Sequence, residues 1–188
     1  MDVTEIATGL WRWTAPHPEW QEGDGWERGV GCVLYEAPEA TVLIDPLVPP
    51  EQEEFLQELD RDVVRRGQPV SILLTVPWHA RSKDTLVKRY GACPEAPSSV
   101  EPFAVPEADE TLWWLPNHTA LVTGDVLLGA DGGVRVCPDS WLDGSATPEA
   151  VRARLRPLLD LPIDRILPAH GSPVLAQGRG ALEKALAR

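Results

Sequence analysis

The chain has few of the residues that build disulfide frameworks, thiolate metal sites and nucleic-acid-binding surfaces. Its three cysteines, Cys32, Cys93 and Cys137, are scattered over 188 residues, and no two of them form a CxxC pair. This pattern argues against a disulfide scaffold and a thiolate zinc site. Basic residues number 17 against 29 acidic ones, so the net charge is −12. Such a chain repels nucleic-acid phosphate and anionic membranes, and we expect neither as a partner.

Long apolar runs are also missing. None approaches the ~20 residues of a membrane span, and no basic region followed by an apolar core opens the chain, so we expect no secretory signal. The odd, unpaired cysteines fit a reducing compartment, and we expect a cytoplasmic protein with free thiols. The length suits one domain, residues 1–188, with a substantial core. The sequence leaves the oligomeric state open.

Strand patterns alternate with helix patterns, which is typical of an α/β fold. Ser82 and Thr147 are expected to cap two of the helices, and Gly91 to end one of them. Strands are expected at residues 6–14, 29–35, 41–44, 70–75, 100–105, 111–115, 119–123 and 163–167. Helices are expected at residues 51–66, 83–90 and 148–160, with a short helix at the C-terminus.

Three of the expected strands end in turns that carry a polar side chain. His79 follows LLTVPW, Asp125 follows ALVTG, and His170 follows RILPA. Two imidazoles and a carboxylate are a ligand set that zinc or another divalent metal uses with one position open for water. Such a metal lowers the pKa of its water to roughly 7 and generates a hydroxide nucleophile. A lone histidine or aspartate in a turn is usually structural, but three such turns in one small chain favour a site.

These segments resemble the metallo-β-lactamase superfamily over nearly the whole chain. TVLIDP, SILLT, LPNHTALVTGD and ILPAHG occur in the order of that family's motifs. The resemblance implies a four-layer α/β/β/α sandwich, a fold found mostly in metal-dependent hydrolases. In the family, the aspartate of TGD bridges two metals and the histidine of AHG binds the second. Asp125 and His170 match those two positions.

The main ligand motif of the family is degenerate here. Where the family has THxHxDH, this chain reads TVPWHAR from Thr75, which replaces both leading histidines and the aspartate and puts Arg81 at the last histidine. His79 lies one residue out of register. The family's GHT motif would fall within residues 104–109, which contain no histidine. The resemblance therefore implies a hydrolase-like protein without the standard dinuclear zinc centre.

Three hypotheses follow for the function. In the first, His79, Asp125 and His170 hold a single divalent metal, zinc if one is present, and the protein hydrolyses a small or ester-like substrate. In the second, no metal is bound and the protein is a small-molecule binding module, with Arg81 paired to Asp125. In the third, His79 is the general base of a metal-free enzyme. Arg81 favours the second hypothesis, because a fixed positive charge repels a metal and neutralises the aspartate.

Candidate catalytic residues are therefore His79 and Asp125. Arg81, Trp78 and Trp20 are the candidate substrate-binding residues. Trp20 belongs to a polar loop at residues 15–28, where a tryptophan either contacts ligand or pins the loop onto the core. No rule connects this loop to a substrate class.

Overall fold

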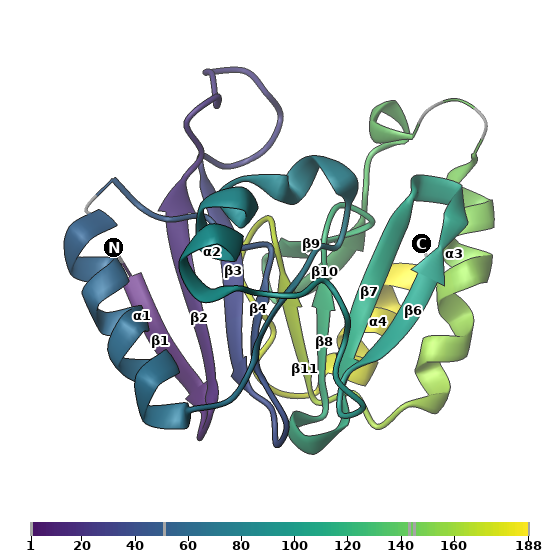
Figure 1. The fold of residues 1–188 in the computed structure, drawn as a ribbon. Helices are drawn as coiled ribbons and strands as arrows, with labels where there is room; N and C mark the ends of the chain where they lie inside the picture. The colour runs from purple at the N-terminus through teal and green to yellow at the C-terminus, as the bar shows by residue number, and fades with distance from the viewer. Residues whose placement is uncertain (1, 51, 143, 145, 188) are drawn as a thin grey trace. The chain divides into compact units, whose positions relative to one another are not determined.

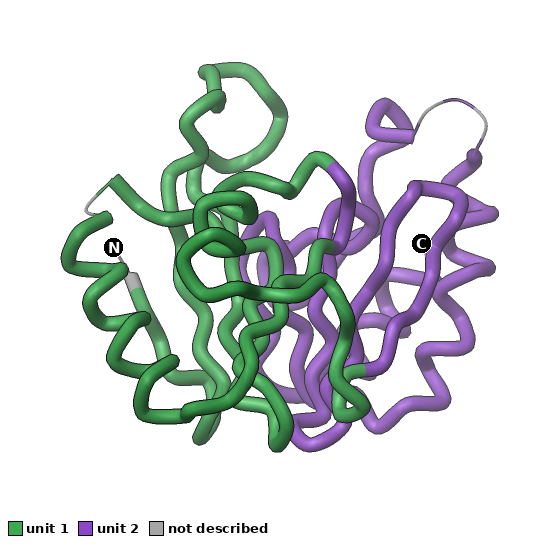
Figure 2. The backbone as a smooth tube through the Cα atoms, viewed as in Figure 1, with its two compact units in different colours: residues 1–74, 78–100 green, residues 75–77, 101–188 purple. Residues whose placement is uncertain are grey.

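The computed structural model describes residues 2–50, 52–142, 144 and 146–187. Contacts between residues divide the chain into two compact units (Figure 2). Unit 1 comprises Met1–Leu74 and Trp78–Val100, and unit 2 comprises Thr75–Pro77 and Glu101–Arg188. Each unit has its own strands and helices, most of which Figure 1 labels.

The sheet of unit 1 has the strand order β1-β2-β3-β4-β5. Its strands are β1 Asp2–Ala7, β2 Leu10–Pro16, β3 Gly29–Glu36, β4 Thr41–Ile44 and β5 Val70–Leu73. The first four strands pair antiparallel, and β4 pairs with β5 in parallel. The parallel pair needs a crossover, and α1 (Gln52–Arg66) provides it.

Two helices of unit 1, α1 and α2 (Lys83–Tyr90), contribute to one apolar core with the sheet. Phe55 and Leu59 lie one turn apart on α1 and are both buried, and the ring centroid of Phe55 is 5.3 Å from that of Trp13. The buried members of this core are Trp13, Ala15, Val30, Cys32, Leu34, Leu43, Leu47, Phe55, Leu59, Val70, Ile72 and Leu86.

Two predictions for unit 1 are wrong in detail. The single strand expected at residues 6–14 is two strands, because the chain reverses at Gly9, whose φ of 80° suits glycine. Ser82 does not cap α2 with its side chain. Its hydroxyl instead accepts a hydrogen bond from the backbone N–H of Val48 at 2.9 Å. Gly91 ends α2 in the left-handed conformation, as predicted.

The main sheet of unit 2 has the order β11-β8-β7-β6, and a separate hairpin joins β9 and β10. The strands are β6 Glu101–Val105, β7 Glu110–Leu115, β8 Ala120–Thr123, β9 Leu127–Ala130, β10 Gly133–Val136 and β11 Arg165–Pro168. The helices are α3 (Pro148–Leu155) and α4 (Gly178–Leu186). Their apolar residues join the sheet in one core, which includes Leu112, Leu121, Val151, Leu155, Ile166 and Leu182.

Two boundaries in unit 2 also differ from expectation. The helix expected at residues 148–160 changes to a 3₁₀ turn at Arg156–Asp160, because Pro157 has no N–H to donate and its ring opposes a continuing α-helix. The strand expected at residues 163–167 is β11, which spans Arg165–Pro168. Thr147 caps α3 as predicted, since its hydroxyl accepts the N–H of Ala150 at 3.2 Å.

Gly180→Ala is expected to raise the free energy of unfolding by about 0.5–1 kcal/mol. Gly180 lies in α4, and a Cβ there would meet no atom within 4 Å. Gly178→Ala is the contrasting variant, because its Cβ would lie 2.9 Å from the Ile163 side chain and 3.0 Å from the Asp164 backbone. Thermal denaturation of both variants checks this, and a loss of stability in Gly180→Ala would contradict it.

All three cysteines are free, as the sequence predicts. Among the helices of the described residues, none combines the length and apolar character needed to cross a membrane.

Candidate functional site

The predicted site residues are divided between the two units. Unit 1 contains Trp20, Trp78, His79 and Arg81, whereas Asp125 and His170 are in unit 2. The local geometry of each group follows from the strands that precede it.

His79 is held by a buried carboxylate. His79 lies in the 3₁₀ turn Pro77–Ala80 after β5 and is 4% exposed. Its Nδ1 is 2.9 Å from Oδ2 of Asp45. Asp45 follows β4 and is 2% exposed. Because β4 and β5 are parallel neighbours, their carboxyl ends lie at the same sheet edge. A neutral imidazole has one nitrogen that carries a proton, and a carboxylate accepts from that nitrogen. Nδ1 of His79 therefore donates to Asp45, and Nε2 keeps a lone pair.

Arg81 ties the turn after β5 to neighbouring backbone. Its Nη1 donates to the carbonyl of Asp45 at 3.1 Å and to the carbonyl of Gly31 at 3.4 Å. Its φ of 38° is left-handed, which is unusual for a residue with a long side chain. Both of these bonds go to backbone oxygens, so they do not support the hypothesis that Arg81 serves as a substitute cation beside Asp125.

The two predicted tryptophans differ in environment. Trp78 is 59% exposed, and its contact with a substrate stays a prediction. Trp20 is half-buried, and its indole N–H donates to the carbonyl of Trp26 at 2.8 Å. The ring of Trp26 in turn packs edge-on against His17, with centroids 5.3 Å apart. Through these contacts Trp20 helps to order its own loop.

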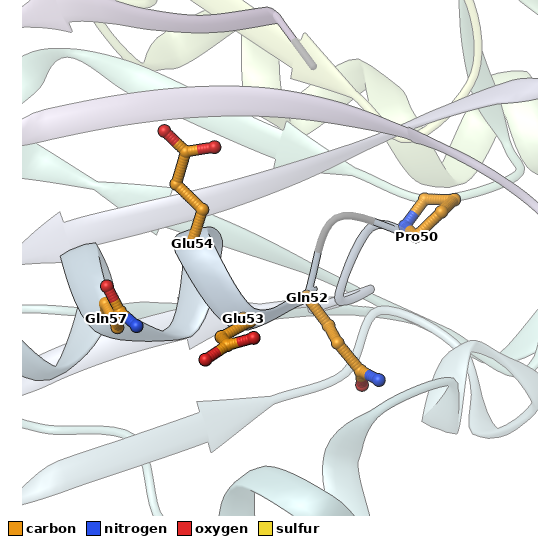
Figure 3. Close-up of a pocket in the computed structure, with 5 residues that line it drawn as sticks. All are labelled: Pro50, Gln52, Glu53, Glu54 and Gln57. Carbon is orange, nitrogen blue, oxygen red and sulfur yellow. The ribbon is translucent and has the colours of Figure 1, made fainter.

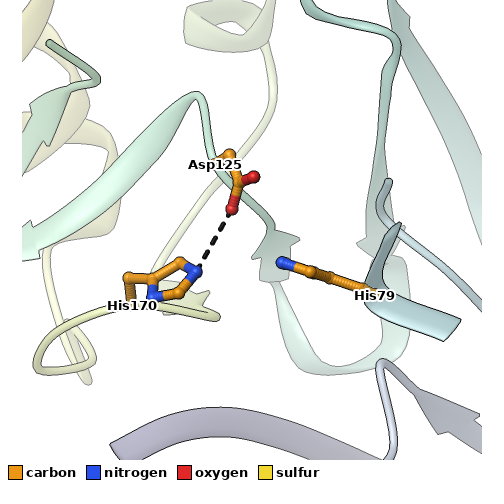
Figure 4. A group of neighbouring side chains, drawn as sticks. All are labelled: His79, Asp125 and His170. Carbon is orange, nitrogen blue, oxygen red and sulfur yellow. Dashed lines mark ion pairs between the residues drawn. The ribbon is translucent and has the colours of Figure 1, made fainter. Parts of the chain in front are cut away.

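Asp125 and His170 pair within unit 2. Nε2 of His170 lies 3.3 Å from Oδ1 of Asp125 (Figure 4). Asp125 follows β8 and His170 follows β11, and these strands are parallel neighbours in the sheet. Trp141 packs edge-on against the imidazole of His170, with centroids 5.8 Å apart. Strand adjacency thus brings together two of the three predicted metal ligands.

A crossing of two glycines holds the loop behind His170. The N–H of Gly129 donates to the carbonyl of His170 at 2.8 Å. A Cβ on Gly129 would overlap the backbone O and N of Ser172 and lie 2.7 Å from the carbonyl carbon of Gly171. Gly171 has a φ of 82°, and a Cβ there would lie 2.9 Å from Cα of Gly129. Neither position has room for a side chain.

The turn that carries Asp125 rests on the buried carboxylate of Glu110. Glu110 is the first residue of β7, is 3% exposed, and accepts the N–H groups of Gly124, Asp125 and Val126 at 2.8 Å each. Burial and then the Asp125 charge raise the pKa of Glu110 to about 8, while the three N–H donors favour its ionised form. A Cβ at Gly124 would lie 2.9 Å from Cβ of Thr75, so the turn is tightly packed.

Asp45 and Glu110 are the residues that the sequence interpretation missed. Asp45 offered the same signal as His79, Asp125 and His170, since it also directly follows a buried strand. Glu110 offered none, because an acidic residue after Asp109 is typical of an exposed turn.

A separate shallow pocket lies at the start of α1 (Figure 3). None of the predicted site residues is among the described residues that line it. Its lining residues are Pro50, Gln52, Glu53, Glu54 and Gln57.

Comparison with known proteins places the fold. No family model matches the chain, and no curated protein gives a significant match. Similar solved structures include VMB-1 at pH 5.5, with a TM-score of 0.61 and 15% identity over 99% of this chain and 94% of that one. The metallo-β-lactamase from Pontibacter korlensis has a TM-score of 0.57 and 17% identity over 99% and 97%.

A third similar structure is the NDM_FIM-1 like metallo-β-lactamase from Erythrobacter litoralis in its mono-zinc form. Its TM-score is 0.59, with 16% identity over 99% of this chain and 94% of that one. These matches confirm the predicted α/β fold class. At such identities the likeness establishes the fold alone, and the chain has the metallo-β-lactamase fold.

Proposed function

We propose that this protein is a hydrolase that binds one divalent metal ion through His79, Asp125 and His170. The observation that carries the proposal is the Asp125–His170 pair within unit 2, to which His79 would add a second imidazole. Three protein ligands leave a coordination position for water, as in catalytic zinc sites. The proposal requires His79 of unit 1 to reach the Asp125–His170 pair of unit 2, and metal binding tests that requirement.

The residues around the donors suit a metal. Asp45 holds Nδ1 of His79, which leaves Nε2 as the ligand atom and follows the carboxylate–histidine–metal pattern. Asp125 Oδ1 and His170 Nε2 already lie 3.3 Å apart, so both could face one ion. A bound metal would supply a water of lowered pKa as the nucleophile. The roles of the protein are to fix the ligands and, through Trp78 and its neighbours, to receive a small substrate.

A single ion is favoured over two by the ligands that remain. The sequence has Val76 and Trp78 where the resemblance would place two histidines, and it has no histidine within residues 104–109. One of the similar structures is described as a mono-zinc form, which supports the fold's capacity to hold one zinc.

A metal-free hydrolase is the second candidate, and the Asp45–His79 pair favours it. A buried carboxylate 2.9 Å from Nδ1 is the arrangement that orients a general base. In this case Nε2 of His79 would accept a proton from water or from a substrate hydroxyl. Hydrolysis of model esters that persists after metal removal would select this candidate.

Elemental analysis of protein purified without chelator, followed by Co²⁺ titration, tests the proposal. We expect one ion per chain. Asp125→Asn and His170→Ala should each weaken binding about 100-fold or more, because each removes one of three ligands. His118→Ala is the matched control, since His118 belongs to the hairpin turn Pro116–His118 and not to the donor set. Folded protein that binds no metal would overturn the proposal.

A further inference from the structure

One carboxylate holds the backbone of the turn that presents Asp125. Oε1 of Glu110 accepts the N–H of Gly124, and Oε2 accepts those of Asp125 and Val126, all at 2.8 Å. Three consecutive amides thus point at a single side chain. The next strand residue, Thr111, donates its N–H to the carbonyl of Thr75 at 2.8 Å, which fixes the strand behind the carboxylate.

Stability alone gives a poor account of a carboxylate at this position. Among the described residues, Glu110 forms no ion pair with lysine or arginine, so only backbone donors offset the cost of its burial. The Asp125 carboxylate also opposes its charge. A buried polar group that is satisfied by several directed bonds fixes one geometry more tightly than apolar packing does.

The fixed geometry concerns Asp125. Because the amides of residues 124–126 cannot rotate away from Glu110, the Cα–Cβ direction of Asp125 is set. With the backbone in this position, Oδ1 of Asp125 lies 3.3 Å from Nε2 of His170.

We propose that Glu110 is a positioning residue, which holds the turn at residues 124–126 so that Asp125 faces His170 and thereby sets the affinity for a divalent metal. The metal part of this inference rests on the proposed function. The positioning part does not, because it concerns backbone order in the metal-free protein.

The first test is amide hydrogen exchange of the metal-free wild-type chain. The amides of Gly124, Asp125 and Val126 should exchange as slowly as the core strand β8, because all three are bonded to a buried carboxylate. Exchange as fast as that of an exposed loop would overturn the inference. This measurement needs neither a variant nor a metal.

The second test compares Glu110→Gln with the wild type. Both oxygens of Glu110 accept these bonds, whereas glutamine keeps one acceptor oxygen and replaces the other with an NH₂ group that can only donate. At least one amide at residues 124–126 should therefore exchange tenfold faster or more. Co²⁺ affinity should fall about 10- to 100-fold, as for other residues that orient metal ligands, and the Co²⁺ absorption spectrum should change. If the glutamine variant does not fold, Glu110→Asp, which keeps the charge on a shorter arm, takes its place with the same expected changes.

Two controls separate positioning from general destabilisation. Leu112→Val weakens packing in the same strand but leaves the carboxylate in place, so Co²⁺ affinity should stay within twofold of wild type. Glu101→Gln removes an exposed carboxylate on β6 and should change neither readout. A folded Glu110→Gln with unchanged exchange and unchanged Co²⁺ affinity would overturn the inference. If wild type binds no Co²⁺, the proposed function fails, while the exchange data still decide whether Glu110 orders the turn.

Discussion

Gly129→Ala is expected to lower the free energy of unfolding by about 3 kcal/mol. The added methyl group would overlap the backbone O and N of Ser172, and backbone atoms cannot rotate away as a side chain can. Relief requires the loop at residues 171–172 to move, which stretches the bond from the Gly129 N–H to the His170 carbonyl. Urea denaturation monitored by tryptophan fluorescence measures the change.

Gly133→Ala is the matched control for this substitution. Gly133 lies on β10, the hairpin partner of β9, and its Cβ would make an ordinary 3.7 Å contact with Ala181. Its unfolding free energy should stay close to wild type. If Gly129→Ala proves as stable as Gly133→Ala, the close contact between Gly129 and the backbone of Ser172 is contradicted. Since the crossing carries His170, Gly129→Ala should also weaken metal binding.

Asp45→Ala is expected to cost about 3 kcal/mol of stability, because it removes the buried carboxylate that accepts from Nδ1 of His79. Part of the cost is in the backbone: Asp45 has a φ of 49°, which aspartate and asparagine tolerate better than alanine does. Asp45→Asn separates the two effects. It keeps the backbone preference and one acceptor oxygen, and should lose roughly half as much.

The same two variants bear on metal binding. Without the carboxylate, the ring of His79 is free to turn, so Co²⁺ affinity should fall about 10- to 100-fold in Asp45→Ala. Asp139→Ala, an exposed aspartate on a 3₁₀ turn, is the control and should change neither stability nor affinity. Equal stability of Asp45→Ala and Asp139→Ala would contradict the role given to the Asp45–His79 bond.

Elements decided by local sequence were predictable. β4 and α2 have the predicted bounds, because an apolar β-branched run defines one and a glycine in the left-handed conformation ends the other. Predictions failed where a single residue overrides the pattern around it. Gly9 breaks an alternation that is otherwise continuous, and Pro157 tightens a helix whose apolar spacing continues.

The same distinction between local and long-range information applies to the candidate site. The positions after strands predicted His79, Asp125 and His170, since a strand end can be read from a few neighbouring residues. Asp45 also follows a strand, but its bond to His79 joins residues 34 apart, and the bonds of Glu110 reach 14 to 16 residues along the chain. Such contacts depend on which strands become neighbours, and short-range patterns do not contain that information.

The division of the chain into two units has a consequence for biosynthesis. Unit 2 includes Thr75–Pro77, a segment that lies between two parts of unit 1 in the sequence. Thr75 accepts the N–H of Thr111 and packs against Gly124, both made later by the ribosome. A nascent chain that has emerged from the ribosome only as far as residue 100 therefore lacks both of these partners of Thr75. The two units are interleaved along the chain, so a single cut between them cannot yield two intact folding modules.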